Sequence, residues 1–251
     1  LGALVAQSIC HAREVPREDI DDAETKMAAF EHFEHRNGEF SLVNAYLSAT
    51  AVRLGEEPHG PEIIADNGLR KVVEIGSEDG GPSALLASSR NLLLIVLRRP
   101  APERLSKLWD ILQVGLTDGS DWESGRIHSG SSSEIQDLWP ELLSELDSMR
   151  ERRQAVWLTG HGLGGSLAVL AACRLNEEEI PVRGIYTFGQ PKIGDSDFAD
   201  RCSDHLGLDD DGSPYYRVVY RDDIVPRLKP PYVQSRKPAI DALSPFIHFG
   251  S

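Results

Sequence analysis

The stretch AVWLTGHGLGGSLAVLAACRL, residues 155–175, decides the fold. It starts with apolar and β-favouring residues, continues through a glycine-dense segment, and ends in an alanine- and leucine-rich segment over 166–175. This order predicts a strand, a sharp turn and a helix. The first amides of such a helix point unpaired N–H groups at whatever occupies the turn, so the turn is predicted to favour negative charge.

Two motifs overlap in this turn. The letters GHGLG, starting at Gly160, have the frame of the nucleophile elbow G-x-S-x-G, with Gly162 in the place of the serine. Gly160, Gly162 and Gly165 also spell G-x-G-x-x-G, the fingerprint of a nucleotide-binding module. That fingerprint requires an acidic residue at the end of the next strand. The acidic residues 177–179 instead precede the next predicted strand, 182–188, so the nucleotide-binding interpretation is the weaker alternative.

Length and composition indicate the class of protein. Apolar residues make up 40% of the 251 residues, and no run approaches the roughly 18 apolar residues of a membrane span. We expect one soluble α/β domain over residues 1–251, with 1–40 as a helical N-terminal extension. The net charge of −14 argues against nucleic acid as a partner. Residues 1–10 are apolar without a preceding basic region, so secretion after removal of a signal and a cytoplasmic location both stay open.

The cysteines number three, at Cys10, Cys173 and Cys202, which is too few for a disulfide framework. Three reduced thiols are the simpler interpretation. A single bridge between Cys10 and Cys202 is the alternative.

The rest of the chain predicts alternating strands and helices. Apolar spacing favours helices over 11–36, 41–54, 134–153 and 195–206, with Pro140 inside the third. Strands are expected at 69–75, 83–87, 92–98, 182–188 and 215–220, and a polar loop at 129–133. The run LLLIVLR over 92–98 is apolar on both faces, which is typical of a central strand. This alternation indicates a mostly parallel sheet with helices on both faces.

Five segments, in one order, resemble the class 3 (fungal-type) lipases, which are α/β-hydrolases. TGHGLGGSLA resembles the family's TGHSLGGALA elbow. The others are IHSG (127–130), FGQPKIG (188–194), YRVVYRDDIVPRL (216–228) and FIHFG (246–250), similar to VHxGF, FGxPRVG, RxVxxxDxVPxL and YxHxG. The resemblance spans roughly residues 42–250 and implies an α/β-hydrolase fold.

The resemblance also implies a chemistry, the hydrolysis of acyl esters such as triacylglycerol by a Ser-His-Asp triad without cofactor or metal. It places Gly162 at the nucleophile position, Asp223 as the acid and His248 as the base, with Asp222 as second choice for the acid. Ser166 lies one helical turn beyond the elbow and should point away from the substrate. Loss of the serine costs on the order of 10⁶ in kcat in a subtilisin-type hydrolase.

The oxyanion hole and the substrate contacts are assigned in the same way. The Leu163 amide is one expected oxyanion donor, while the second falls on Pro100, which has no N–H. A shift of one residue would place Arg99 there instead. Arg99, His161 and Trp109 are the expected substrate-binding residues. Residues 103–112 fit the family's lid helix, with an ordinary packed helix as the alternative.

Two functional hypotheses follow from Gly162. The first is a natural pseudoenzyme, inactive or nearly so, that keeps a pocket for an acyl ester or fatty acid. The second is an engineered Ser-to-Gly variant of an active lipase. Pro100 favours the first hypothesis, because a designer would not also damage the oxyanion hole. The intact context of Asp223 and His248 favours the second, because drift would erode it.

Overall fold

A computed structural model of the chain describes residues 30–76, 81–99, 116–118, 125–206, 215–221, 223 and 225–227. The strands of its main sheet are Lys71–Gly76 (β1), Ser83–Ser88 (β2), Leu92–Arg98 (β3), Ala155–His161 (β6), Val182–Phe188 (β7) and Tyr215–Val218 (β8). Their order across the sheet is β1-β2-β3-β6-β7-β8. The pairs β3/β6, β6/β7 and β7/β8 are parallel, and β2 is antiparallel to both of its neighbours. The predicted mostly parallel sheet is confirmed.

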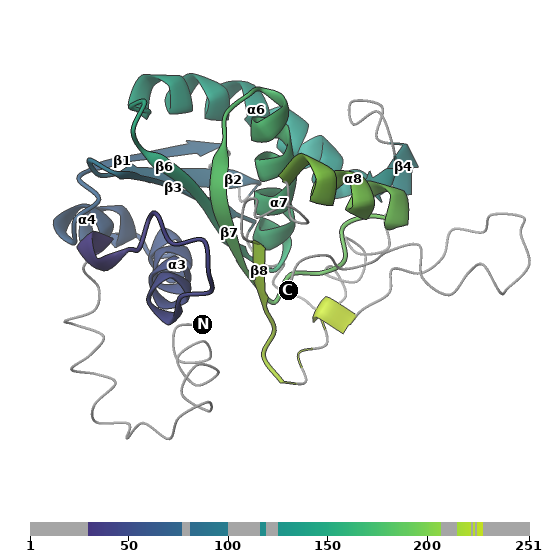
Figure 1. The fold of residues 1–251 in the computed structure, drawn as a ribbon, viewed down its shortest axis with the longest axis horizontal. Coiled ribbons are helices and arrows are strands. Elements are labelled where there is room, and N and C mark those ends of the chain that lie inside the picture. The colour runs from purple at the N-terminus through teal and green to yellow at the C-terminus, as the bar shows by residue number, and fades with distance from the viewer. Residues whose placement is uncertain are drawn as a thin grey trace, which may run out of the picture.

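Helices cover both faces of this sheet (Figure 1). They are Leu42–Gly55 (α3), Gly60–Asp66 (α4), Ser129–Met149 (α6), Leu163–Glu177 (α7) and Ser196–Leu206 (α8). α3 and α4 pack on one face, whereas α7 packs on β3, β6 and β7 from the other, with α6 and α8 beside it. A separate two-stranded sheet joins Leu116–Asp118 (β4) to Arg126–His128 (β5). Short 3-10 helices lie at Phe30–His32 (η1) and Val225–Arg227 (η2). Within the described ranges, no helix is long and apolar enough to cross a membrane.

Side chains that alternate along the central strands form a core on each face. Val156 and Leu158 of β6 point into the core under α6 and α7, while Trp157 between them points into the core under α3 and α4. Every residue of β3 from Leu92 to Leu97 is buried, which confirms that this strand is central. Two buried layers hold the sheet rigidly, so the carboxyl ends of β3, β6, β7 and β8 form a fixed edge.

The segment before α3 is fastened across the same sheet by aromatic side chains. Trp157 Nε1–H donates to the carbonyl of His35 (3.1 Å), and the Tyr216 hydroxyl donates to that of Gly38 (3.0 Å). The Tyr186 hydroxyl accepts from the Ser41 N–H (3.0 Å). The structure thus differs from the helix predicted over 11–36, since the described end of that range is only the η1 turn followed by non-helical chain.

The start of α6 also differs from the prediction. Residues 129–133, expected to be a polar loop, form the first turn of the helix. The cause is His128, whose Nδ1 accepts a hydrogen bond from the Ser131 N–H (3.1 Å) and caps the helix. Histidine is not among the usual N-cap residues, so the sequence pattern did not indicate this start.

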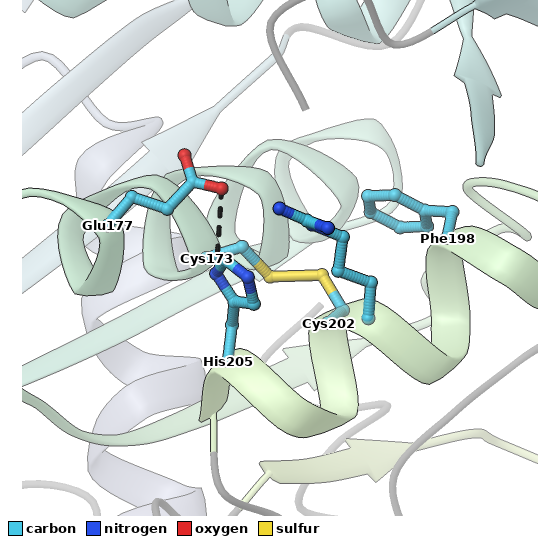
Figure 2. A pocket seen from close by; sticks show the side chains of 6 residues that line it. Cys173, Glu177, Phe198, Cys202 and His205 are labelled. Carbon is cyan, nitrogen blue, oxygen red and sulfur yellow. Dashed lines mark ion pairs between the residues drawn. A yellow bond between two sulfur atoms is a disulfide. The ribbon is translucent and has the colours of Figure 1, made fainter. Parts of the chain in front are cut away.

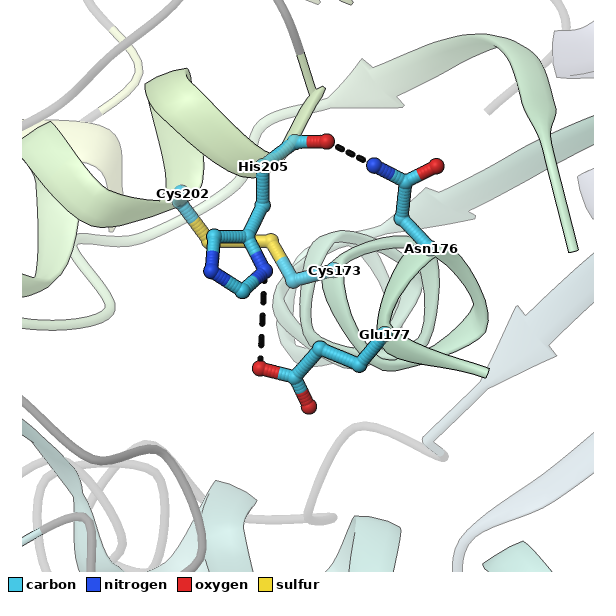
Figure 3. Close-up of a disulfide and its surroundings, with 5 residues drawn as sticks. All are labelled: Cys173, Asn176, Glu177, Cys202 and His205. Atoms are coloured by element: carbon cyan, nitrogen blue, oxygen red, sulfur yellow. Dashed lines mark hydrogen bonds and ion pairs between the residues drawn. A yellow bond between two sulfur atoms is a disulfide. The ribbon is translucent and has the colours of Figure 1, made fainter. Parts of the chain in front are cut away.

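The prediction of reduced thiols is wrong. Cys173 of α7 and Cys202 of α8 form a disulfide, with Cα atoms 6.0 Å apart, as Figure 3 shows. Because α8 packs on α7, it brings together two residues 29 positions apart in the sequence. The alternative bridge from Cys10, which lies outside the described residues, is excluded because Cys202 is already bonded.

Candidate active site

The turn between β6 and α7 consists of one residue, Gly162, with φ 54° and ψ −124°. A side-chain-bearing L-residue is strained at this positive φ. The Gly162 N–H donates to the carbonyl of Phe188 (2.9 Å), and its own carbonyl accepts from the Gly165 N–H (3.0 Å). Backbone hydrogen bonds therefore hold the turn to the end of β7 and to the first turn of α7.

The glycines of the turn differ in the space around them. A Cβ atom built on Gly160 would lie 2.3 Å from the carbonyl oxygen of Gly164, and one on Gly164 would lie 2.4 Å from that of Leu97. No side chain fits at either position, because backbone already occupies the space. Among the described residues, no atom beyond the two chain neighbours of Gly162 lies within 4 Å of a Cβ atom built there. In the motif Gly160–Gly164, a side chain is therefore excluded at residues 160 and 164, and residue 162 is called the open position below.

The first backbone amide of α7 directly follows this open position. Leu163 begins the 15-residue helix α7, so its N–H has no acceptor within the helix and lies at the positive end of the helix dipole. The nearby hydroxyls do not replace a nucleophile. Ser166 and Thr159 are both buried, at 2% and 0% exposed, and neither side chain comes within 4 Å of the Cβ position of residue 162.

Asp223, the predicted acid, lies after β8 at the same edge of the sheet. Its N–H donates to the carbonyl of Tyr220 (2.8 Å), and its Oδ1 accepts from the Val225 N–H (3.0 Å). Its Oδ2 faces Gly189, where an added Cβ atom would lie only 2.9 Å from that oxygen. Gly189 also has a φ of +57°. A glycine is therefore needed there both for the backbone and for the approach of the carboxylate.

His161, predicted to bind substrate, faces the same glycine. The Cβ position of Gly189 lies 3.4 Å from His161 Nε2, so the imidazole and the Asp223 carboxylate converge on one point. Burial lowers the pKa of His161, and the charge of Asp223 opposes this shift. Sequence reasoning missed this pairing, and the glycine of the FGQPKIG segment is the only signal that indicated close packing there.

Hydrogen bonds join the segments around the elbow. The His128 N–H donates to the carbonyl of Ile193 (2.7 Å), and the Arg126 N–H donates to Asp195 Oδ1 (3.0 Å). The Tyr215 hydroxyl donates to Gln190 Oε1, and burial raises the pKa of Tyr215 to about 12. These hydrogen bonds join segments that are separate in the sequence, β5 to residues 193–195 and β8 to Gln190.

Other predicted site residues are placed as follows. Arg99 follows β3, and its Nε lies 2.7 Å from Glu134 Oε1 of α6, with both side chains about one-fifth exposed. Asp222, His248, Pro100, Trp109 and the proposed lid at 103–112 lie outside the described residues. Within the described ranges, no group of three or more His, Cys, Asp or Glu side chains could hold a metal ion.

The chain matches the family model described as lipase (class 3) over residues 102–233, more than half of its length. The chain belongs to the class 3 lipase family. Class 3 lipase membership favours the elbow interpretation of the turn over the nucleotide fingerprint. The positions of the carboxylates also argue against the nucleotide fingerprint. The acidic residues 177–179 lie at the C-terminal end of α7. The fingerprint needs an acidic residue directly after β7, where Gly189 and Gln190 stand instead.

Among curated relatives, a triacylglycerol lipase (OBL1) of Arabidopsis thaliana is 47% identical over 92 residues, which cover 35% of this chain and 17% of that protein. A secreted mono- and diacylglycerol lipase of Fusarium solani is 40% identical over 73 residues, 29% of this chain and 20% of that protein. The matched stretch is therefore about a fifth or less of the length of each of these two proteins.

A solved structure extends the comparison to the fold. The Rhizomucor miehei lipase in complex with its propeptide superposes with a TM-score of 0.61 at 21% identity, over 94% of this chain and 68% of that one. At this identity the similarity is one of fold. It confirms the predicted α/β-hydrolase fold of this class 3 lipase chain.

Proposed function

We propose that this chain binds acyl lipids at its elbow and is inactive, or nearly so, as a serine esterase because Gly162 occupies the nucleophile position. The observation that carries this proposal is the contrast among the glycines. Positions 160 and 164 have no room for a Cβ atom, whereas at position 162 no described residue beyond the chain neighbours comes within 4 Å of that atom. An elbow with space for a side chain at the nucleophile position, but without that side chain, can bind an acyl group without forming an acyl-enzyme.

The other parts of the elbow support binding. The Leu163 N–H, at the start of α7, can donate a hydrogen bond to a carbonyl oxygen, and Asp223 lies beside Gly189. The family resemblance assigns His248 as the base and places Pro100 where the second oxyanion donor would stand. A missing donor costs on the order of 10²-fold in rate, so the proposed site is weaker in catalysis than in binding.

Gly162→Ser tests the assignment of the nucleophile position. The variant should hydrolyse p-nitrophenyl butyrate at least about 10³-fold faster than the unchanged chain, because it regains the attacking hydroxyl. Gly162→Ala is the matched control, since it adds the same backbone strain without a hydroxyl. A rate equal to that of Gly162→Ala would contradict the assignment. A rate typical of an active lipase would favour the alternative, a Ser-to-Gly variant of a working enzyme.

Lipid binding is tested separately by thermal unfolding. A fatty acid or monoacylglycerol at 100 times its Kd should stabilise the chain by about 2.7 kcal/mol and raise its Tm. Glycerol and acetate, which carry the head groups without an acyl chain, are the controls. If acyl chains of four to eighteen carbons all leave the Tm unchanged, the chain is not an acyl-lipid binder.

A further inference from the structure

His161 is a titratable side chain beside the open position, and the proposed binding function does not use it. It is the last residue of β6, directly before Gly162. Its Nε2 lies against Gly189. Gly189 directly follows Phe188, whose carbonyl accepts a hydrogen bond from the Gly162 N–H. The imidazole therefore lies where the ends of β6 and β7 meet, against Gly189.

The second group at this point is Asp223, whose Oδ2 faces the same side of Gly189. Its other oxygen is held by the Val225 N–H, which fixes the orientation of the carboxylate. A carboxylate fixed beside an imidazole orients it and stabilises the imidazolium that forms when it takes a proton. Gly189 permits this arrangement because it places no side chain between the two groups.

Burial, rather than charge, favours the neutral imidazole. Of the described residues, Asp223 acts on it through its charge, and Arg217 of β8 interacts with Asp223 in turn. Burial lowers the pKa of His161 from its ordinary value, while Asp223 raises it in part. The imidazole is therefore neutral near pH 7 and able to accept a proton.

We propose that His161, supported by Asp223, is the general base for a slow, serine-independent hydrolysis of activated acyl esters at the open position beside Gly162. This proposal rests on the proposed function, because the acyl group must first bind at the elbow. A side chain at residue 162 would occupy the space that an attacking water needs. Without a side chain at residue 162, water attacks the ester directly and no acyl-enzyme forms.

The reaction needs only the ester and water. The water oxygen forms a bond to the acyl carbon while His161 takes one of its protons, and the carbonyl electron pair moves to oxygen. The Leu163 N–H donates to that oxyanion. The intermediate then expels the leaving alkoxide, breaking its bond to the acyl carbon, and the alkoxide takes the proton from the imidazolium. The products are a carboxylic acid and an alcohol.

The test measures kcat/KM for p-nitrophenyl butyrate from pH 5 to pH 9 with the full chain. His161→Gln should lower kcat/KM about 10²-fold, the size expected for loss of a general base. His205→Gln, on α8 far from the elbow, is the matched control and should leave it unchanged. Asp223→Asn should lower the plateau and move the acid limb of the profile to lower pH, because loss of the carboxylate charge lowers the pKa of His161.

One further variant keeps the result decisive. His161→Asn repeats the test if the glutamine variant does not fold, as judged by circular dichroism. The proposal is overturned if both His161 variants keep the rate of the unchanged chain, or if the unchanged chain does not exceed the rate in buffer.

Lipid binding by the same samples separates this proposal from the one before it. A retained lipid-induced rise in Tm, with hydrolysis unaffected by His161→Gln, means that only the general-base role fails. The absence of any lipid-induced rise in all samples means that the proposed binding function fails. Lost hydrolysis with a retained rise in Tm supports both.

Discussion

The two ends of helix α7 are built in opposite ways. At its N-terminal end, the elbow consists of backbone: Gly162 has space at its Cβ position among the described residues, and the Leu163 amide begins the helix. At its C-terminal end, side chains bind the helix to α8 through a disulfide from Cys173 and a hydrogen bond from Asn176 Nδ2 to the carbonyl of His205. An ion pair between Glu177 and His205 completes that set (Figure 2). The helix is thus fastened by side chains at one end and by backbone hydrogen bonds of Gly162 at the other.

Removing the disulfide should have the largest effect on stability. Cys202→Ser opens a covalent loop across 29 residues, and loop-closure entropy predicts a loss of about 3.5 kcal/mol in the free energy of unfolding. Urea unfolding of the oxidised chain and of the variant measures the difference. The unchanged chain in excess dithiothreitol is the control and should move toward the variant. Identical midpoints in all three samples would show that the bond does not fasten α8 to α7.

Two glycine variants at the N-terminal end of α7 should have the next largest effect on stability. Gly164→Ala forces a Cβ atom against the Leu97 carbonyl and should cost about 3 kcal/mol, because α7 must move away from β3. Gly162→Ala meets no atom of the described residues within 4 Å beyond its chain neighbours and should cost only about 1 kcal/mol, from its positive φ. Denaturation midpoints of the two variants decide the matter. Equal losses would mean that the open position at 162 is not a side-chain position.

The sequence predicted the sheet well for a physical reason. Its central strands are apolar on both faces, and the turn at Gly162 has a spacing that only a strand–turn–helix unit accommodates. The strands at 83–87, 92–98 and 182–188 were found within one residue of their predicted ends. Local pattern was sufficient because these segments are buried whatever their neighbours are.

What the sequence could not predict depends on contacts between distant elements. The disulfide requires α8 to pack on α7, and nothing local to Cys173 or Cys202 indicates that packing. The pairing of His161 with Asp223 depends on the backbone of Gly189, which lies between them in space rather than in sequence. These features follow from tertiary structure, which residue spacing does not encode.

Asn176→Ala should produce a smaller loss at the fastened end of α7. The side-chain amide donates to the carbonyl of His205, and its removal should cost about 1 kcal/mol because a net hydrogen bond of this kind contributes roughly that much. Glu177→Gln is the matched control on the same turn. It should cost about 0.5 kcal/mol or less, because the ion pair is partly exposed. A larger loss from Glu177→Gln would make charge, rather than the disulfide and hydrogen bond, the main fastening.

The smallest expected effect lies at the open end, in the pH dependence of stability. Burial lowers the pKa of His161 in the folded chain, so the unfolded chain binds a proton that the folded chain excludes. Stability should therefore be complete above the ordinary histidine pKa of about 6.5 and should fall as the pH drops below it. Asp223→Asn should steepen this fall, because the carboxylate is the group that favours the imidazolium, and His161→Gln should remove it. Urea midpoints between pH 5 and pH 7.5 measure the slope for each variant. If the pH dependence of the urea midpoint is unchanged in His161→Gln, another titratable group causes it. The N-terminal end of α7 would then not differ from the C-terminal end in the pH dependence of its stability.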